Sequence, residues 1–214
     1  LNLPQRIRQD FPILQRKVHG KDLVYLDNAA SAQKPLAVIE GQREYLSNYH
    51  SNIHRGAHHL AQLATEAFEG GRQKIADHIG AQGSEEIIFT GGSTDAINLV
   101  AQAWGRANLT SKDTVLVTQM EHHANIVPWQ MVCEERGAKV VPVKVREDGT
   151  LDLDHFATCL ERHQPKMVAF VHASNTLGTI NPAQALCAQA KAAGALTLVD
   201  GSQALPHFSI DVQT

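Results

Sequence analysis

The sequence predicts an α/β fold with a mainly parallel sheet and helices on both of its faces. Short apolar segments alternate with amphipathic segments of about ten or more residues, which is typical of strands joined by crossover helices. The apolar segments are nearly continuous runs of Val, Ile and Leu, as expected for parallel strands buried on both faces. No internal repeat or linker divides the chain.

The first long element that the pattern predicts is a helix over residues 60–79. Its apolar residues recur at i, i+3 and i+4, which keeps one helix face apolar; they are Leu60, Leu63, Ala64, Ala67, Phe68, Ile75 and Ile79. Residues 86–90 form a short apolar segment and predict a strand. The glycines in residues 91–94 then predict a turn into a helix over residues 95–106.

Strand and helix patterns alternate regularly from residue 114 onward. Residues 114–118 predict a strand, and residues 127–136 predict a helix that Gly137 closes, as glycines commonly do at helix ends. Residues 139–145 predict the next strand, and residues 152–163 predict the next helix.

The last part of the chain completes this alternation. Residues 167–172 predict an apolar strand, and the Ala-rich residues 182–193 predict a helix that begins on Pro182. Residues 196–199 predict a buried strand that runs into Asp200. Ligands of parallel α/β sheets bind at the carboxyl ends of the strands, and the polar motifs of this chain fall at those ends.

The composition is that of an ordinary globular protein. The chain has 214 residues, 43% hydrophobic and 19% charged, which is enough for one large domain. We expect an amino-terminal extension over residues 1–22 and a single domain over residues 23–214. A formal net charge of −3 with scattered Lys and Arg predicts neither a nucleic acid nor an anionic membrane as partner. No stretch approaches the roughly 18 apolar residues of a membrane span.

Cysteine usage and the first residues predict a cytoplasmic protein. The cysteines are far apart and form no C-x-x-C pair, which favours a reducing environment and buried structural thiols; they are Cys133, Cys159 and Cys187. Residues 1–11 carry Arg6, Arg8 and Asp10 where a secretory signal would be continuously apolar. The chain begins on Leu rather than Met and ends directly after an apolar stretch, so we expect a piece of a longer protein.

The first motif is the turn Thr-Gly-Gly-Ser-Thr at residues 90–94. It joins a strand pattern to a helix start and combines two glycines with the hydroxyls of Ser93 and Thr94, which suits a phosphate cradle. The alternative is a tight turn in which Ser93 or Thr94 only caps the helix.

The second motif is Glu-His-His-Ala-Asn at residues 121–125. Adjacent histidines do not suit a shared metal, and H-E-x-x-H spacing is absent, so we expect no metal site. One histidine that lies flat on a planar cofactor or moves protons is the better interpretation. The alternative is a polar loop with exposed histidines.

The third motif, residues 171–178, contains Asn175, whose amide suits a hydrogen bond to a cofactor oxygen or a substrate carboxylate. The alternative is an Asx turn in which Gly178 supplies an unusual backbone angle.

The fourth motif places Asp200 at the end of an apolar strand. A buried carboxylate is costly unless a cation or donors meet it, and the protonated pyridine nitrogen of a cofactor is such a partner. The alternative is an Asp that caps a helix. Because all four motifs fall at one edge of the predicted sheet, together they favour a ligand site.

These segments resemble, in the same order, those of class V aminotransferase-like cysteine desulfurases. They are Tyr-Leu-Asp-Asn-Ala-Ala-Ser (25–31), His-Arg-Gly (54–56), Gly-Ser-Thr (92–94), Glu-His-His-Ala-Asn (121–125), His-Ala-Ser-Asn (172–175) and Asp-Gly-Ser-Gln (200–203). The resemblance covers essentially the whole chain and is greatest to the branch that mobilises sulfur for iron–sulfur cluster assembly.

The resemblance implies a fold, a cofactor and a reaction. The fold is the large domain of pyridoxal 5'-phosphate (PLP) fold type I, incomplete here, and the expected assembly is a homodimer. The implied reaction converts L-cysteine to L-alanine and leaves a persulfide on an enzyme cysteine. A sulfur-acceptor protein is expected as partner of the full-length enzyme.

The resemblance also implies site residues. Ser93 and Thr94 would bind the phosphate, while His123 would stack on the pyridine ring as the catalytic residue. Asp200 would pair with the ring nitrogen and Gln203 with the phenolic oxygen. The residues expected in the substrate pocket are Ala29, Ala30, His54, Arg55 and Asn175, the last of which would also lie near the phenolic oxygen.

Some parts of the family's pattern are missing. Its Schiff-base lysine, nucleophilic cysteine and substrate-binding arginine lie beyond the point that this chain reaches, and neither Lys191 nor Cys187 fits those positions. Gly91 stands where many members of this branch carry Arg. We therefore expect the 214-residue chain by itself to form no covalent link to PLP and to be inactive.

Two other functions remain open from the sequence. One is another class V PLP enzyme, a transaminase or a selenocysteine lyase, because substrate choice depends partly on residues beyond this chain. The other is a non-catalytic truncated product.

Overall fold

The computed structural model describes residues 3–213, which fall into two compact units, one up to Ile87 and one from Ile88 onward. The boundary that we expected between residues 22 and 23 remains a prediction. Among the described residues, no helix has the length and apolar character needed to cross a membrane.

The first unit is mostly helical. Its long helix, α3 (His59–Ile79), confirms the predicted one; His58 Nδ1 accepts a hydrogen bond from Ala61 N at its start, and Gly80, with φ of 70°, ends it. The other elements are α1 (Leu3–Gln9), η1 (Pro12–Gln15), the antiparallel pair β1 (Lys17–Val18) and β2 (Lys21–Asp22), α2 (Leu36–Glu44), η2 (Tyr45–Tyr49) and η3 (Ser84–Glu86).

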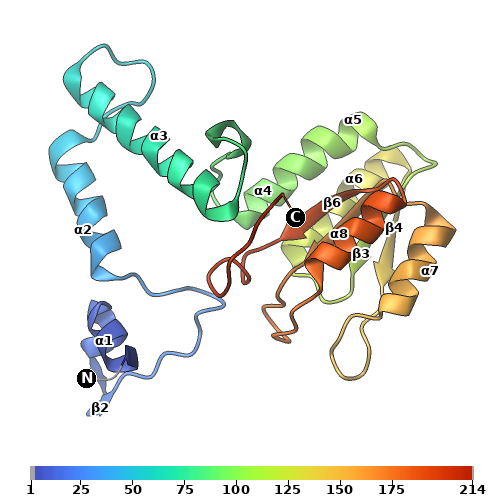
Figure 1. Ribbon diagram of the computed structural model, residues 1–214, viewed down its shortest axis with the longest axis horizontal. Helices are drawn as coiled ribbons and strands as arrows, with labels where there is room; N and C mark the ends of the chain where they lie inside the picture. The colour runs from blue at the N-terminus through green and yellow to red at the C-terminus, as the bar shows by residue number, and fades with distance from the viewer. Residues whose placement is uncertain (1–2, 214) are drawn as a thin grey trace. The chain divides into compact units, whose positions relative to one another are not determined.

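The second unit is built on a parallel four-stranded sheet in the order β4-β3-β5-β6, which confirms the predicted α/β fold (Figure 1). The strands are β3 (Thr114–Thr118), β4 (Lys139–Val143), β5 (Met167–Val171) and β6 (Leu196–Asp200). All residues of β3 and β5, the two inner strands, are buried. The continuous apolar runs therefore identified the centre of the sheet.

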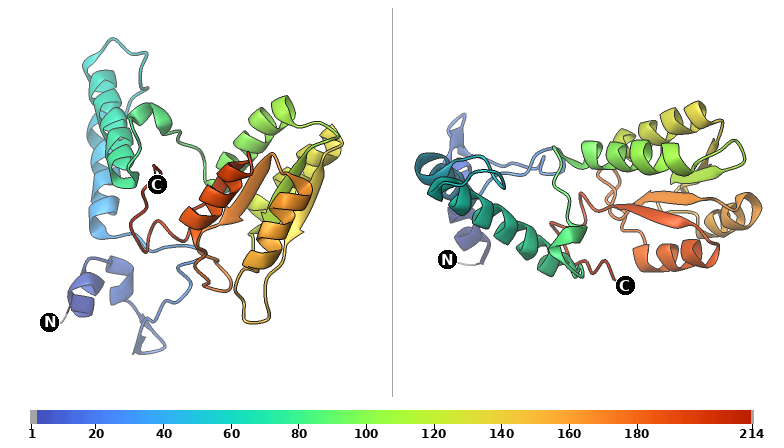
Figure 2. Two further views of the ribbon diagram at one scale, coloured as in Figure 1. Left: turned by 45° about the vertical axis from the view of Figure 1, so that its right-hand side comes forward. Right: turned by 90° about the horizontal axis from the view of Figure 1, so that it is seen from above.

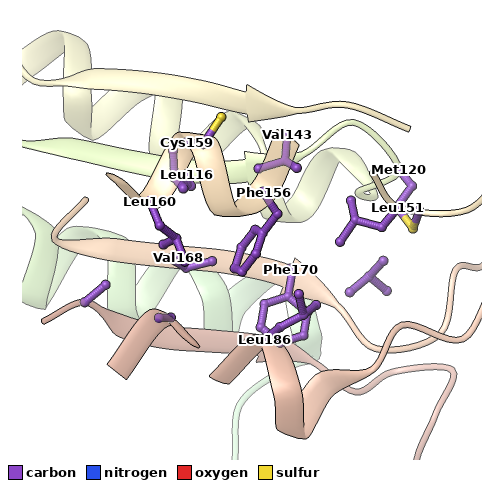
Figure 3. Close-up of a cluster of buried hydrophobic side chains, with 13 residues drawn as sticks. Leu116, Met120, Val143, Leu151, Phe156, Cys159, Leu160, Val168, Phe170 and Leu186 are labelled. Carbon is purple, nitrogen blue, oxygen red and sulfur yellow. The ribbon is translucent and has the colours of Figure 1, made fainter. Parts of the chain in front are cut away.

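Helices cover both faces of this sheet, as predicted (Figure 2). They are α4 (Ser93–Val100), which continues through the π-helical turn η4 (Ala101–Gly105) into α5 (Arg106–Asn108), then η5 (His123–Asn125), α6 (Val127–Arg136), α7 (Leu153–His163) and α8 (Ala183–Ala192). One core cluster packs α7 and α8 against the sheet around Phe156, Phe170 and Leu186 (Figure 3). A second cluster around Trp129 packs α6 and η4 against the opposite face.

The strand predicted over residues 86–90 is wrong. Ser84–Glu86 form a 3-10 turn, and residues 87–90 form neither a helix nor a strand and pair with no strand in the described part of the chain. Ile88 is 72% exposed, so its apolar side chain faces no core there. An apolar segment becomes a strand only where a neighbour accepts its main-chain hydrogen bonds.

The bounds of two elements differ from the prediction by two residues, and one predicted strand is less buried than expected. The helix expected over residues 95–106 begins at Ser93 and extends to Asn108. The strand expected over residues 139–145 ends at Val143, because Val145 instead bridges to Leu151. The strand expected to be buried at residues 196–199 is β6, which pairs only with β5 among the described strands and leaves Leu196 53% exposed.

Replacing Leu186 with Ala should destabilise the protein by roughly 2–5 kcal/mol, because this fully buried side chain fills the core between α8 and the sheet. Leu177→Ala is the matched control, since that leucine is half exposed, and should change stability by less than about 0.5 kcal/mol. Unfolding in urea gives both values. Equal effects of the two substitutions would contradict this description of the core.

Candidate functional site

Parallel pairing brings the carboxyl ends of β3, β5 and β6 to one edge of the sheet. Val171 and Asp200, the last residues of β5 and β6, lie opposite each other in the register. Three of the predicted motifs lie at these strand ends or within three residues of them, at residues 121–125, 172–175 and 200–203. The sheet therefore accounts for their common location.

The fourth motif forms the start of α4. Gly92 precedes the helix with φ of 157°, a backbone conformation that glycine adopts readily and other residues rarely do. Ser93 and Thr94 are exposed and lie in the first helical turn, and no side chain caps this end. The alternative in which these hydroxyls only cap the helix is therefore not observed. Main-chain N–H groups of a first turn, together with the helix dipole, suit an anion.

Ser202 connects this turn to Asp200. The Ser202 main-chain N and Oγ both donate to Asp200 Oδ1, at 2.9 and 2.5 Å. Ser202 Oγ also lies 2.8 Å from Ser93 Oγ, across 109 residues of sequence. Since a hydroxyl has one proton and that of Ser202 points to Asp200, Ser93 is the donor in this pair. The first turn of α4 and the carboxylate of Asp200 are thus neighbours.

Asp200 is a buried carboxylate with one oxygen still open. It is only 7% exposed, and Ser202 satisfies Oδ1. Within the described residues, Oδ2 receives no hydrogen bond, and no cationic side chain forms an ion pair with Asp200. The chain continues in turns over residues 202–207, so Asp200 caps no helix. A buried carboxylate of this kind favours a cationic partner. Gln203 lies half-buried in the same turn.

Glu121 is a buried carboxyl that the sequence analysis did not single out. Its Oε1 accepts hydrogen bonds from Thr118 Oγ1 and from Val171 N, and its Oε2 accepts one from Asn125 Nδ2. Burial raises the pKa of Glu121 to about 7; the three donors oppose this rise, and the charge of Asp200 adds to it. A Glu followed by Asn at i+4 directly after a buried strand was the signal available in the sequence.

The two histidines of the second motif have different surroundings. His122 and His123 are both exposed, with ring centroids 6.1 Å apart. His122 Nδ1 accepts a hydrogen bond from Ala124 N and so caps η5, whereas His123 is the first residue of η5. The residue pattern did not separate these two neighbours, and only the family resemblance singled out His123. Among the described residues, no group of His, Cys, Asp and Glu side chains could hold a metal ion.

The loop after β5 is organised by a serine rather than by Asn175. Ser174 is buried, and its Oγ accepts hydrogen bonds from Thr176 N and Leu177 N at 3.4 and 3.1 Å. Asn175 is exposed in this loop, and Gly178 has φ of 72°, the unusual angle expected of it. The amide of Asn175 is not the group that forms the turn.

The four remaining predicted site residues belong to the first unit. Ala29 and Ala30 lie in an exposed turn in which Ala30 N donates to Asp27 O. The ring of His54 lies against α3, with Nε2 2.7 Å from Glu69 Oε1, and Arg55 beside it is exposed. Their assignment to a substrate pocket remains a prediction.

Two of the three cysteines are buried thiols, as expected from the sequence. Cys133 and Cys159 are buried, and burial raises the pKa of both thiols, that of Cys133 to about 11. Cys187 is half-buried and packs against the core under α8. Lys191 lies in the last turn of α8.

Replacing Asp200 with Asn should lower the pKa of Glu121 from about 7, because the substitution removes a nearby negative charge but keeps an oxygen for Ser202. A carboxyl ¹³C NMR titration measures this pKa. The folded protein holds the Glu121 proton above its ordinary pKa of 4.5, so this group makes stability fall as the pH rises from 4.5 to about 7. The fall should be smaller in Asp200→Asn. Asp154→Asn, whose side chain is 95% exposed, is the control, and equal shifts in both variants would contradict the coupling.

Comparison with known proteins agrees with this arrangement. Curated relatives include a probable cysteine desulfurase of Synechocystis, 49% identical over 99% of this chain, and a cysteine desulfurase of Pectobacterium atrosepticum, 47% identical over 98% of it. The chain spans about half the length of these relatives, 50% and 51% respectively.

Solved structures give the same result for the fold. The apo structure of a cysteine desulfurase from Thermococcus onnurineus matches with a TM-score of 0.91 and 34% identity, over 100% of this chain and 51% of that chain. A cysteine desulfurase from Escherichia coli matches with a TM-score of 0.86 and 36% identity, over 100% and 52%.

The family model described as aminotransferase class-V matches residues 24–214, nearly the whole length of the chain. The match includes all the segments at the sheet edge. The chain therefore belongs to the class-V aminotransferase family.

Proposed function

We propose that the full-length gene product containing this chain is a PLP-dependent cysteine desulfurase. It would convert L-cysteine to L-alanine and leave the sulfur as a persulfide on one of its own cysteines. The class V family and its cysteine desulfurases depend on PLP, and the curated relatives at 45–49% identity bear that name. The observation that carries the proposal is the buried carboxylate of Asp200, whose Oδ2 accepts no hydrogen bond from the described residues. The hydroxyls of Ser202 and Ser93 connect this carboxylate to the first turn of α4, which suits an anion.

The residues at this edge fit PLP in charge and in chemistry. PLP has a phosphate at one end and a pyridine nitrogen that can carry a proton. The first turn of α4 with Ser93 and Thr94 would hold the phosphate. The buried carboxylate of Asp200 would hold the proton on the ring nitrogen, since it has a free acceptor oxygen and no cationic partner among the described residues.

The remaining predicted residues complete the proposed site. His123 would lie on the ring face and move a proton, a role that its exposed position at the start of η5 allows. Gln203 would bind the phenolic oxygen, and Asn175 that oxygen or the substrate carboxylate. Ala29, Ala30, His54 and Arg55 would line the substrate pocket. When bound, PLP supplies an electron sink for bonds to the substrate's α-carbon.

Further parts of the proposal follow from the reaction. A persulfide must pass its outer sulfur to an acceptor before the thiol can react again, so we propose a sulfur-acceptor protein as partner and iron–sulfur cluster assembly as the destination. We also propose a homodimer in the cytoplasm. A dominant population of monomers at working concentration, measured by analytical ultracentrifugation, would contradict the assembly.

The assay for this function is direct. The purified full-length gene product, supplied with PLP, L-cysteine and a thiol reductant, should form alanine and sulfide in equal amounts. Two further substrates test the related enzymes: selenocysteine in place of cysteine, and an amino acid with a keto-acid acceptor. Amino transfer without sulfide release, or turnover of selenocysteine alone, would replace the proposal by a transaminase or a selenocysteine lyase.

Replacing Asp200 with Ala in this protein should lower the turnover of cysteine by several orders of magnitude, because the ring nitrogen loses the carboxylate that keeps it protonated. Asp154→Ala is the control, since Asp154 is exposed on α7 and should leave turnover unchanged. Initial rates of alanine formation give both values. Asp200→Ala turnover within a factor of about ten of the wild type would refute the assignment.

Replacing His123 with Ala should shift the absorption band of bound PLP and slow turnover by roughly a hundredfold or more, because the ring loses its stacking partner and a proton carrier. His78→Ala removes an exposed imidazole from the last turn of α3 and serves as control. Absorption spectra and stopped-flow rates test the pair. An unchanged spectrum and rate in His123→Ala would mean that this histidine is only an exposed loop residue.

A further inference from the structure

The buried carboxyl of Glu121 joins two strands, the short helix η5 and, through Asn125, helix α6. It accepts hydrogen bonds from Thr118 Oγ1 at the end of β3, from Val171 N at the end of β5 at 2.9 Å, and from Asn125 Nδ2 at 2.7 Å. Glu121 is 9% exposed, and the three donor residues are buried at least as deeply. If one of these hydrogen bonds is lost, burial keeps water from replacing it.

The direction of these bonds is dictated by chemistry. Trp129 Nε1 can only donate, and it donates to Asn125 Oδ1 at 3.2 Å. The amide of Asn125 therefore cannot turn around, and its Nδ2 must face Glu121. The main-chain N–H of Val171 also can only donate. The side chain at position 121 must therefore accept one hydrogen bond from Val171 N and another from Asn125 Nδ2. A carboxylate has two acceptor oxygens for this, whereas an amide has only one.

The bonds of Glu121 enclose the segment that carries His123. Glu121 lies immediately before the His-His pair, and Asn125 lies two residues after His123. Asn125 N additionally donates to His122 O at 2.8 Å. The side chain of Glu121 thus bonds to Asn125 at the far end of the loop of residues 122–125 and fixes that loop to β5.

We infer that Glu121 is a positioning residue, which anchors the loop of residues 122–125 to the ends of β3 and β5 and thereby sets where His123 lies. Its importance for turnover rests on the proposed function, whereas the anchoring itself does not.

The charges nearby agree with this role. Burial raises the pKa of Glu121 and the charge of Asp200 adds to the rise, while the other titratable groups close in sequence are His122 and His123 on the loop itself. A positive group beside Asp200 would offset its charge and favour the ionised form of Glu121. That form accepts all three hydrogen bonds, so a cation at the site would strengthen the anchor.

The test exploits the fixed direction of the bonds. Glu121→Gln has nearly the same shape but places an NH₂ group against Asn125 Nδ2 or against Val171 N–H. The double variant Glu121→Gln/Asn125→Asp restores a donor facing an acceptor, and the new carboxylate can still accept from Trp129 Nε1. Glu134→Gln makes the same chemical change at an exposed position of α6 and is the matched control.

The first measurement needs neither cofactor nor substrate. In the cofactor-free full-length gene product labelled with ¹³C-histidine, the ring signals of His123 should shift and broaden in Glu121→Gln. They should return toward the wild-type positions in the double variant and remain unchanged in Glu134→Gln. Wild-type His123 signals in Glu121→Gln, or a double variant no closer to wild type than the single one, would overturn the inference.

The second measurement is turnover of L-cysteine. We expect Glu121→Gln to lower kcat about tenfold or more with little change in KM, and the double variant to recover most of this loss. Should Glu121→Gln fail to fold by circular dichroism, the double variant decides: recovered folding and His123 signals support the inference, and recovered folding without those signals overturns it. Should both fail, Thr118→Val removes one donor only, and the His123 signals must shift in it by a smaller amount.

Failure of the proposed function is distinguishable from failure of this inference. A wild-type protein that binds no PLP or releases no sulfide would refute the proposed function, and the cofactor-free His123 signals would still decide the role of Glu121.

Discussion

Parallel pairing of β3, β5 and β6 is the constraint on which the rest of the second unit depends. It places the last residues of three strands at one edge, where the main-chain N–H and C=O groups no longer have partners in a neighbouring strand. Val171 lies at the centre of this edge: its N–H donates to Glu121, its C=O accepts from Asn181 Nδ2 at 2.7 Å, and it pairs in register with Asp200. Side chains thus replace the missing strand hydrogen bonds, and they do so where a ligand can bind.

This edge contains buried polar side chains, whose burial is unfavourable unless hydrogen bonds or an opposite charge satisfy them. The carboxyls of Glu121 and Asp200 are both buried, and the charge of Asp200 adds to the rise that burial causes in the pKa of Glu121. Glu121 is satisfied by donors from the protein, whereas the described residues supply donors to only one oxygen of Asp200. Among the described residues, the buried Oδ1 of Asn181 also has no hydrogen-bond partner. The groups left open on this face are those that an additional molecule, a cation or a water could meet.

The first turn of α4 and the buried carboxylate of Asp200 are the two groups at this edge that would suit a phosphorylated pyridine. Ser202 lies between them and bonds to both Ser93 and Asp200, so in the proposed site the two charged ends of such a ligand would meet opposite charges at neighbouring places. The backbone of Gly92 lets the chain enter the helix in this geometry. Family membership and the chemistry of these residues therefore point to the same cofactor from independent observations.

The sequence by itself determined the features that depend on local chemistry. Helix α6 has the predicted bounds, Gly137 ends it, and the motifs at residues 92–94 and 200–203 lie at one edge as expected. Tertiary structure decided the rest. Residues 86–90 have the pattern of a strand but no partner among the described strands, and β6 pairs with β5 alone among those strands although its sequence is apolar. The acceptor role of Glu121 also depends on Trp129 and Val171, which come from α6 and β5. Burial and hydrogen-bond direction are set by neighbours distant in sequence, so no local pattern can encode them.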